Sequence, residues 1–286
     1  CIFLDNKINT TFIFNWLAKN TKLFYIRDQL IEYFEQVYTN KTALSVVKLF
    51  ILNIKSNEIN SMIFQTKYLD ILYLFTISGA HVNLILWVVK KAFAKNKIIS
   101  EITEWTLILS MTYLLKFSIP LLRILFTKAF SYKFKSSEAA AYSGIINCLL
   151  FVNIANNFGF ILSYGCIFCI YSILKLKIKK YLIVILINVT CSLFSCFILI
   201  SMNNKVNLFS FIYNICLSPF IMFWYLWIQL TFLMPYLQNV QESIYYFYYY
   251  LFNFFVNVDF NIYISSNIKS LFILFYTPFI CLWIRN

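Results

Sequence analysis

Charged residues are scarce in this chain of 286 residues: only 12% are Asp, Glu, Lys or Arg, whereas 61% are hydrophobic. A soluble domain has about a quarter of its residues charged, because its whole surface faces water. Water alone is therefore excluded as the solvent. We expect a lipid bilayer to surround much of the chain.

Glycine and histidine are also rare, and their scarcity removes two kinds of catalytic machinery. The four glycines cannot form the G-x-x-x-x-G-K-[ST] loop that cradles nucleotide phosphates, so the sequence holds no P-loop ATPase. The single histidine, His81, cannot build a hydrolytic metal site that needs several imidazoles. We therefore expect no enzyme activity, no cofactor and no metal.

Apolar segments follow one another from Leu69 to near the C-terminus, separated by short polar or basic stretches. The pattern predicts an all-α fold, a polytopic transmembrane helix bundle of about 7–9 spans, because a span needs ~20 residues. The third and fourth segments are shorter and are candidates for re-entrant half-helices joined as a hairpin. The predicted segments are 69–89, 105–127, 139–155, 158–174, 181–202, 208–234, 244–257 and 269–284.

The first 67 residues differ in character from the rest. Apolar residues recur at helical spacing between Ile26 and Tyr38, with charged residues between them, which predicts an amphipathic helix at the membrane surface or against the bundle. A short apolar segment follows at 43–54. We divide the chain into an N-terminal amphipathic or interfacial segment, 1–67, and a transmembrane domain, 68–286.

Basic residues outnumber acidic ones by 24 to 11, which gives a net charge of +13. Such an excess suits anionic lipid head groups and equally suits a polyanionic substrate. The lysines cluster between the predicted segments, at 90–97, 128–135 and 175–180. If every segment crosses the membrane, the second and third clusters share a side and the first lies opposite, so the positive-inside rule leaves the orientation open.

The only histidine and one of the rare glycines lie together in the sequence I-S-G-A-H-V at 77–82. An imidazole in hydrocarbon is costly, so His81 should face the bundle interior or a wet cavity, and Ser78 would lie near it. Gly79 permits close approach of a second backbone. Packing of a hydrogen-bonded histidine explains this motif as well as a functional role does.

Polar side chains also step along the second predicted span. On a continuous helix, Lys116 and Arg123 would share one stripe with Thr112, Pro120 and Thr127. Two cations on one face of an apolar span require that face to be wet or paired. The alternative is snorkelling, or pairing with a glutamate near the span ends.

A third polar stripe leads to Pro219, and hydrogen bonding between helices is the default use of such residues. Asn214 is the member that we single out as a pathway candidate. Pro120 and Pro219 are expected to break or pack helices. The stripe consists of Asn207, Ser210, Asn214 and Ser218.

Taken in order, these blocks resemble the ComEC-type competence membrane proteins. The block at 77–82 is similar to the L-x-I-S-G-x-H-V motif of that family, and I-P-L-L-R at 119–123 is similar to its S/P-x-x-R-A pattern. G-F-I-L-S-Y at 159–164 resembles its F-Q-L-S-F block, and N-I-C-L-S-P at 214–219 keeps its N-x-x-x-x-P spacing. The resemblance covers roughly residues 27–230 and concerns the membrane core domain alone.

The resemblance implies a channel for uptake of single-stranded DNA across the cytoplasmic membrane during natural transformation. It implies a multi-pass protein of the cell membrane, surrounded by membrane lipids. Its expected partners are single-stranded DNA, an outer-face DNA receptor and a cytoplasmic helicase-like ATPase, and a homo-oligomer is left open. The candidate pathway residues are Ser78, Gly79, His81, Lys116, Arg123 and Asn214.

Two other functions remain open on the sequence. A secondary transporter for a small solute would also use broken spans and polar residues at mid-membrane depth. A membrane-embedded lipid-processing enzyme would use His81 as a general base, although the sequence places no acid near it.

Overall fold

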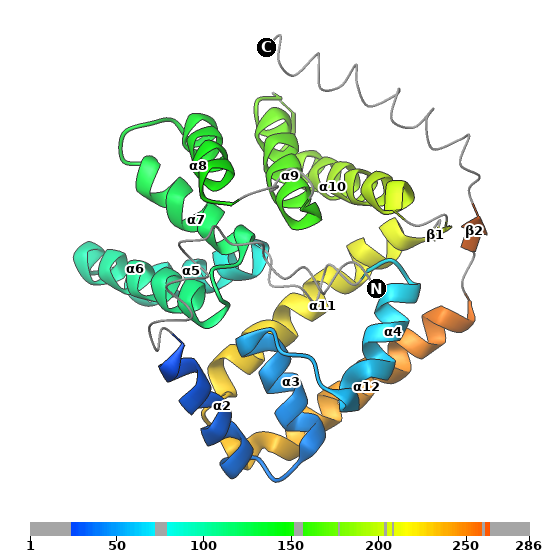
Figure 1. Cartoon of the computed structure of the whole chain (residues 1–286). Coiled ribbons are helices and arrows are strands. Elements are labelled where there is room, and N and C mark those ends of the chain that lie inside the picture. The colour runs from blue at the N-terminus through cyan, green and yellow to red at the C-terminus, as the bar shows by residue number, and fades with distance from the viewer. Residues whose placement is uncertain are drawn as a thin grey trace.

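The computed structural model describes residues 24–71, 79–151, 157–176, 178–202, 205–207, 209–258 and 261–263. This part of the chain is all-helical apart from one short antiparallel ribbon, in which β1 (Lys205–Asn207) pairs with β2 (Asn261–Tyr263). Two 3-10 turns, Asn57–Ile59 and Pro235–Leu237, join helices. The all-α fold class predicted from the sequence is thus confirmed for the described residues (Figure 1).

Eleven α-helices lie in the described part of the chain, in order along the sequence. They are α2 (Tyr25–Val37), α3 (Lys41–Leu52), α4 (Asn60–Tyr68), α5 (Gly79–Ala92), α6 (Lys97–Leu114), α7 (Ile119–Phe130), α8 (Ser136–Leu150), α9 (Phe158–Leu174), α10 (Lys180–Met202), α11 (Ser210–Thr231) and α12 (Gln238–Asn257).

The helix α11 lies between two groups of helices (Figure 1). On one side it packs against α3, which also contacts α2 and α12, and α12 packs against α4. On the other side it packs against α5 and α10, which belong to the group α5–α10. The candidate site described below lies within this second group.

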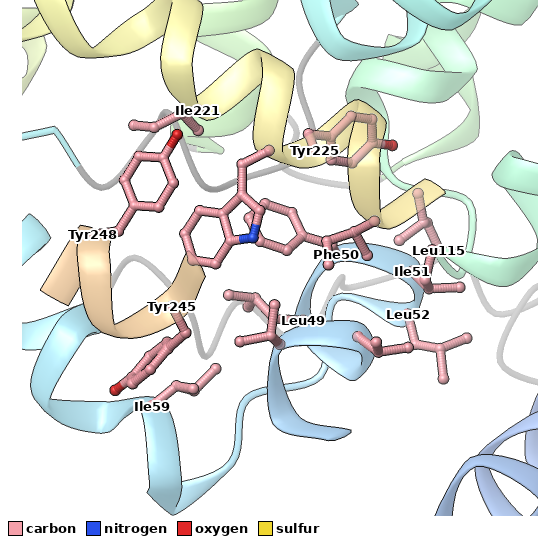
Figure 2. Close-up of a cluster of buried hydrophobic side chains, with 14 of the residues drawn as sticks. Leu49, Phe50, Ile51, Leu52, Ile59, Leu115, Ile221, Tyr225, Tyr245 and Tyr248 are labelled. Atoms are coloured by element: carbon pink, nitrogen blue, oxygen red, sulfur yellow. The ribbon is translucent and has the colours of Figure 1, made fainter. Parts of the chain in front are cut away.

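Aromatic side chains fill the core on the α3–α11–α12 side. Figure 2 shows Phe50, Tyr225 and Tyr248 in one cluster with aliphatic side chains of α3. Trp224 stacks on Tyr248 with ring centroids 4.3 Å apart, and Phe50 meets the indole edge-on at 5.1 Å. Each such ring pair adds about 0.5–1.5 kcal/mol beyond the burial of its area. The cluster fixes α11 against α12 and α3.

Most predicted segments correspond to helices, with shifted ends. The segments 158–174, 181–202 and 208–234 match α9, α10 and α11 closely, and the amphipathic stretch after Ile26 is α2. Of the segment 69–89, the part from Gly79 onward is α5, whereas 72–78 lies outside the described residues, as does the whole segment 269–284. The helix α8 covers most of the segment 139–155, and α12 extends the segment 244–257 towards the N-terminus.

The predicted span 105–127 is wrong as a single helix. The chain forms α6, reverses at 115–118 and returns as α7, with left-handed φ angles of 52° at Lys116 and 54° at Phe117. The N–H of Phe117 donates to the Thr112 carbonyl (2.8 Å), and that of Lys116 to the Tyr113 carbonyl (3.1 Å), which is the Schellman pattern that ends helices. Pro120 then lies in the first turn of α7, where its missing N–H costs nothing.

The side chain of Arg27 holds this reversal against the N-terminal helices. Arg27 is buried, and its Nε donates to the carbonyl of Leu114, the last residue of α6, at 3.0 Å. Its Nη2 donates at 3.4 Å to the carbonyl of Leu52, the last residue of α3. A cation at two helix C-termini satisfies orphan carbonyls and opposes both helix dipoles. In the sequence, Arg27 is one of the charged residues between the apolar positions of this amphipathic helix, and nothing there marks these partners.

One helical stretch among the described residues has both the length and the apolar composition to cross a membrane, Ile212–Thr231 in α11. Of its most apolar 18 residues, 39% are buried within the protein, and core helices of soluble proteins have the same length and composition. The stretches Gly159–Leu174 and Tyr181–Ser195 are apolar but shorter. The polytopic arrangement therefore remains a prediction.

Candidate functional site

Arg123 lies at the centre of the candidate site, on the buried face of α7, with 8% of its surface exposed. Its Nη1 donates to the backbone carbonyl of Ser163 on α9. Its Nη2 lies directly against Gly79 at the start of α5, where any Cβ would overlap the guanidinium. Three sequence blocks, at 77–82, 119–123 and 159–164, therefore meet at this one side chain.

Side chains of α8 support the Arg123 segment from behind. The Ser143 hydroxyl donates to the Arg123 carbonyl at 3.1 Å and lies 2.8 Å from the Tyr164 hydroxyl. The Asn147 amide also donates to the Tyr164 hydroxyl, at 2.6 Å. All four groups are buried, so this network fixes α7, α8 and α9 relative to one another.

The charge of Arg123 is not neutralised by an acid within the described residues. The ion pairs of that part of the chain involve Arg27, Lys48, Lys90 and Lys128 instead. The Nε of Arg123 and, one turn later on α7, the Oγ1 of Thr127 are buried with no hydrogen-bond partner among the described groups. A buried cation and a buried hydroxyl without partners are costly unless a ligand or water completes them.

A cavity of about 690 Å³ opens beside these two residues. Its walls come from α5, α6, α7, α9 and the connection from α7 to α8. Its lining residues include the cations Lys90, Lys97, Arg123 and Lys128 and the acids Glu101 and Glu104.

Glu104 organises the cations at the mouth of this cavity. Its carboxylate accepts a bond from Lys128 Nζ at 2.7 Å and lies 3.6 Å from Lys90 Nζ. The Ser100 hydroxyl also donates to it, at 3.3 Å. The side chain of Glu104 is 7% exposed and that of Lys90 is 63% exposed, so the acid lies inside and the lysine at the rim.

The predicted pathway residues are only partly brought together. Gly79 contacts Arg123, but His81 lies on a different face of α5, buried, with its ring centroid 4.6 Å from that of Tyr225 on α11. His81 does not line the cavity. Asn214 is buried and donates to the Ser192 hydroxyl on α10, as expected for a bond between helices.

The stripe that joined Lys116 to Arg123 does not exist, because the helix ends between them. Lys116 is exposed at the reversal, with its Nζ 5.5 Å from the Phe24 ring centroid. Asn207 likewise belongs to β1 and lies outside α11, and its N–H donates to Asp70 at 2.9 Å. Ser78 lies outside the described residues.

The two singled-out prolines behave differently. Pro120 follows the reversal and starts α7. Pro219 lies inside α11, which continues across it from Ser210 to Thr231, so the helix is not ended there.

Sequence reasoning missed Ser143 and Asn147. It offered Glu104 only as one possible acid partner of Lys116 or Arg123, and Tyr164 only as a member of the block 159–164. A serine and an asparagine on an amphipathic helix look like ordinary solvated positions, and one tyrosine among 21 does not reveal the hydrogen bonds that Tyr164 makes. The reversal alone had a recognisable signal, because Ser118 followed by Pro120 is a helix-start pattern. That pattern would have brought Glu104 and Lys128 to the same end of a hairpin.

No group of three or more His, Cys, Asp or Glu side chains with the geometry of a metal site occurs among the described residues. The fold and site thus define a class: an all-helical protein with an uncompensated buried arginine beside a cavity that several charged side chains line.

The comparisons with known proteins reach two relatives. The chain is 26% identical over 228 residues to the uncharacterized protein MG316 homolog of Mycoplasma pneumoniae, covering 78% of this chain and 61% of the relative. It is 25% identical over 232 residues to the uncharacterized protein MG316 of Mycoplasma genitalium, covering 77% and 59%. The chain thus spans about three fifths of the length of the curated relatives that it matches. No protein-family profile and no solved structure matches it.

Proposed function

We propose that this chain is the membrane core of a channel that takes up single-stranded DNA across the cytoplasmic membrane. Its surroundings are membrane lipids, and its driving force comes from a partner, because the sequence contains no P-loop. A cytoplasmic helicase-like ATPase and an outer-face DNA receptor are the partners that fit this role.

The observation that carries the proposal is the convergence at Arg123. The blocks at 77–82, 119–123 and 159–164 resemble those of competence membrane proteins, and they are up to about 80 residues apart in the chain. Gly79, Arg123 and the Ser163 carbonyl nevertheless lie in direct contact. The contact brings three blocks of the resemblance to one side chain, as a shared site would require.

The cavity beside Arg123 supports the same proposal. A single strand needs a hydrated path with positive charge for its phosphates. Lys90, Lys97 and Lys128 lie towards the outer part of the cavity and Arg123 lies deeper. We therefore centre the DNA path on this cavity and not on Lys116, His81 or Asn214, which lie elsewhere.

A secondary transporter for a small solute is the second candidate, and the size of the cavity favours it. Pockets for small molecules usually measure about 300–1,000 Å³, a range that includes this one. A solute of that size would be released into the cell without any DNA partner. Loss of solute uptake with unchanged DNA uptake in a gene deletion would favour the transporter.

The test of the proposed function is uptake of labelled DNA in the cell from which the protein comes, scored as DNA protected inside the membrane. Deletion should abolish protected DNA, and complementation with the intact gene should restore it. Arg123→Lys keeps the charge but loses the Nη1 that donates to the Ser163 carbonyl and the Nη2 that lies against Gly79, and it should reduce uptake strongly. Lys175→Ala, at an exposed residue after α9, is the matched control and should import normally.

Membrane levels of each variant must be equal before uptake is compared. Wild-type uptake in the deletion strain would contradict the proposal. Wild-type uptake by an Arg123→Ala protein that inserts normally would contradict the role given to Arg123.

A further inference from the structure

Some of the charged side chains that line the cavity are paired and others are not. Both acids are already engaged: Glu104 by Lys128 and Lys90, and Glu101 by the hydroxyl of Tyr132. Lys97 and Arg123 form no ion pair with any of the described residues. The unpaired charges of the cavity are therefore positive: Lys97 lies at the rim and Arg123 lies deep within.

Two hydrogen-bond donors without partners lie in the same part of the cavity wall. Arg123 Nε and Thr127 Oγ1 are both buried without partners, and both residues line the cavity. The spacing of four residues on α7 brings them to one helix face. An oxyanion is the ligand that would satisfy a guanidinium N–H and a hydroxyl together while neutralising the charge.

We propose that this cavity is a binding site for a phosphodiester, whose oxygens accept from Arg123 and Thr127 while Lys97 and Lys90 meet the charge nearer the mouth. The proposal rests on the proposed function only in the choice of a nucleic-acid strand as the carrier. A phospholipid head group carries the same phosphodiester, and the experiment separates the two sources.

Two pairs of neighbouring lysines give a matched test. Lys90 and Lys97 line the cavity, whereas Lys91 and Lys95 lie between them in sequence, are exposed and do not line it. Lys91 instead has its Nζ 5.9 Å from the Trp87 ring centroid. The double variants Lys90→Gln/Lys97→Gln and Lys91→Gln/Lys95→Gln remove the same charge from the same stretch of surface.

The measurement is binding of a short fluorescent oligothymidylate to the purified full chain in detergent, over a range of salt concentrations. Lys90→Gln/Lys97→Gln should weaken binding and lower the slope of log K against log salt by about 1.4, from about 0.7 for each lost single-strand phosphate contact. Lys91→Gln/Lys95→Gln should keep the wild-type slope. Equal losses in both double variants would overturn the proposal, because attraction would then be a property of the whole surface.

Thr127→Val tests the deep end of the cavity with an isosteric change. Loss of one hydrogen bond should weaken oligothymidylate binding about fivefold at all salt concentrations without changing the slope. Binding equal to that of the wild type would overturn the assignment of Thr127. Arg123→Lys is the companion variant, and a folded form that binds as tightly as the wild type would also overturn the site.

Competition identifies the carrier of the phosphodiester. Short-chain phosphatidylglycerol that displaces the oligothymidylate only from proteins with intact Lys90 and Lys97 would assign the site to phosphodiesters in general. Absence of oligothymidylate binding, with normal DNA uptake in cells, overturns this site and leaves the proposed function standing. Binding that follows these expectations, together with unchanged DNA uptake after deletion of the gene, would support the site and overturn the proposed function.

Discussion

Lys128 Nζ lies 2.7 Å from Glu104 Oε2, although 24 residues separate the two in sequence. On one continuous helix those residues would be about 36 Å apart, since each residue adds 1.5 Å. Their contact closes the α6–α7 hairpin at its open end, opposite the reversal at 115–118. Both residues line the cavity beside Arg123.

The cost of breaking this ion pair should depend on which lysine is removed. Lys128→Met leaves the carboxylate of Glu104 almost buried with its shorter contact gone, and should lower the free energy of unfolding by about 3 kcal/mol. Lys90→Met removes the longer contact from an exposed lysine and should cost under about 1 kcal/mol. Thermal unfolding in detergent compares the two. Equal losses of stability would show that the 2.7 Å contact with Lys128 contributes no more than the 3.6 Å contact with Lys90.

Gly79→Ala should damage the site, because its Cβ would occupy the space of the Arg123 guanidinium. We expect a loss of about 1–3 kcal/mol in the free energy of unfolding and reduced DNA uptake at equal membrane levels. Gly144→Ala is the control, since its Cβ would make ordinary contact with the Tyr164 ring at 3.4 Å. Alanine is favoured over glycine within a helix by about 1 kcal/mol, so this control should be neutral or stabilising. A Gly79→Ala protein as stable and active as the control would remove Gly79 from the site.

Tyr164→Phe should lower the free energy of unfolding by about 1–3 kcal/mol, because it leaves Ser143 and Asn147 facing an unpaired, buried position. A double-mutant cycle with Asn147→Leu measures the coupling, and the double variant should lose less than the sum of the single losses. Tyr181→Phe, at an exposed tyrosine of α10, should change stability by under about 0.5 kcal/mol. Additive losses in the cycle would mean that the Asn147–Tyr164 bond contributes nothing.

Lys116→Gly should raise stability by about 1 kcal/mol, since a residue with a side chain is disfavoured at φ 52° and glycine is not. DNA uptake should not change, because Lys116 lies at the hairpin reversal away from the cavity. Lys175→Gly is the opposite case: Lys175 ends α9 with φ −74°, where glycine is disfavoured, and stability should fall. Loss of uptake on changing Lys116 would return that residue to the DNA path.

Acid should weaken the junction between α3 and α4 through Glu58. A hydrogen bond from its own backbone N–H, helped by the Ser45 hydroxyl at 3.2 Å, holds the pKa of Glu58 below its ordinary value despite an opposing effect of burial. A lowered folded-state pKa gives stability that is present above about pH 4.3 and is lost as the pH falls through the folded pKa.

Melting temperatures measured from neutral pH down to acid should show this loss. Glu58→Gln should make the acid part of the profile flatter, and Ser45→Ala should flatten it partly. An unchanged profile in Glu58→Gln would assign the acid sensitivity to other carboxylates.

Periodicity predicted the helices well where one apolar run made one helix, as in α9, α10 and α11. It failed at 105–127, because apolar residues continue through Leu115 and Phe117 and hide a reversal that backbone hydrogen bonds define. Composition indicated that Arg123 needed a partner or a wet face. It gave no means of finding Gly79 or the Ser163 carbonyl beside it, since contacts between helices depend on tertiary packing. Arg27 shows the same limit, because its partners are backbone carbonyls, which no sequence pattern marks.

The reversal at 115–118 also changes which lysine groups lie on the same side of the bundle. In a bundle that spans a bilayer, each additional crossing moves the next connection to the opposite side. With α6 and α7 as an out-and-back pair, the lysines at 90–97 and those at 128–135 lie at the same end of the pair. The pair α8 and α9 makes a second excursion of this kind, because Tyr171 near the end of α9 lines the same cavity as Ser131. Three lysines from groups that conflicted on a continuous span, Lys90, Lys97 and Lys128, therefore line one cavity at that end.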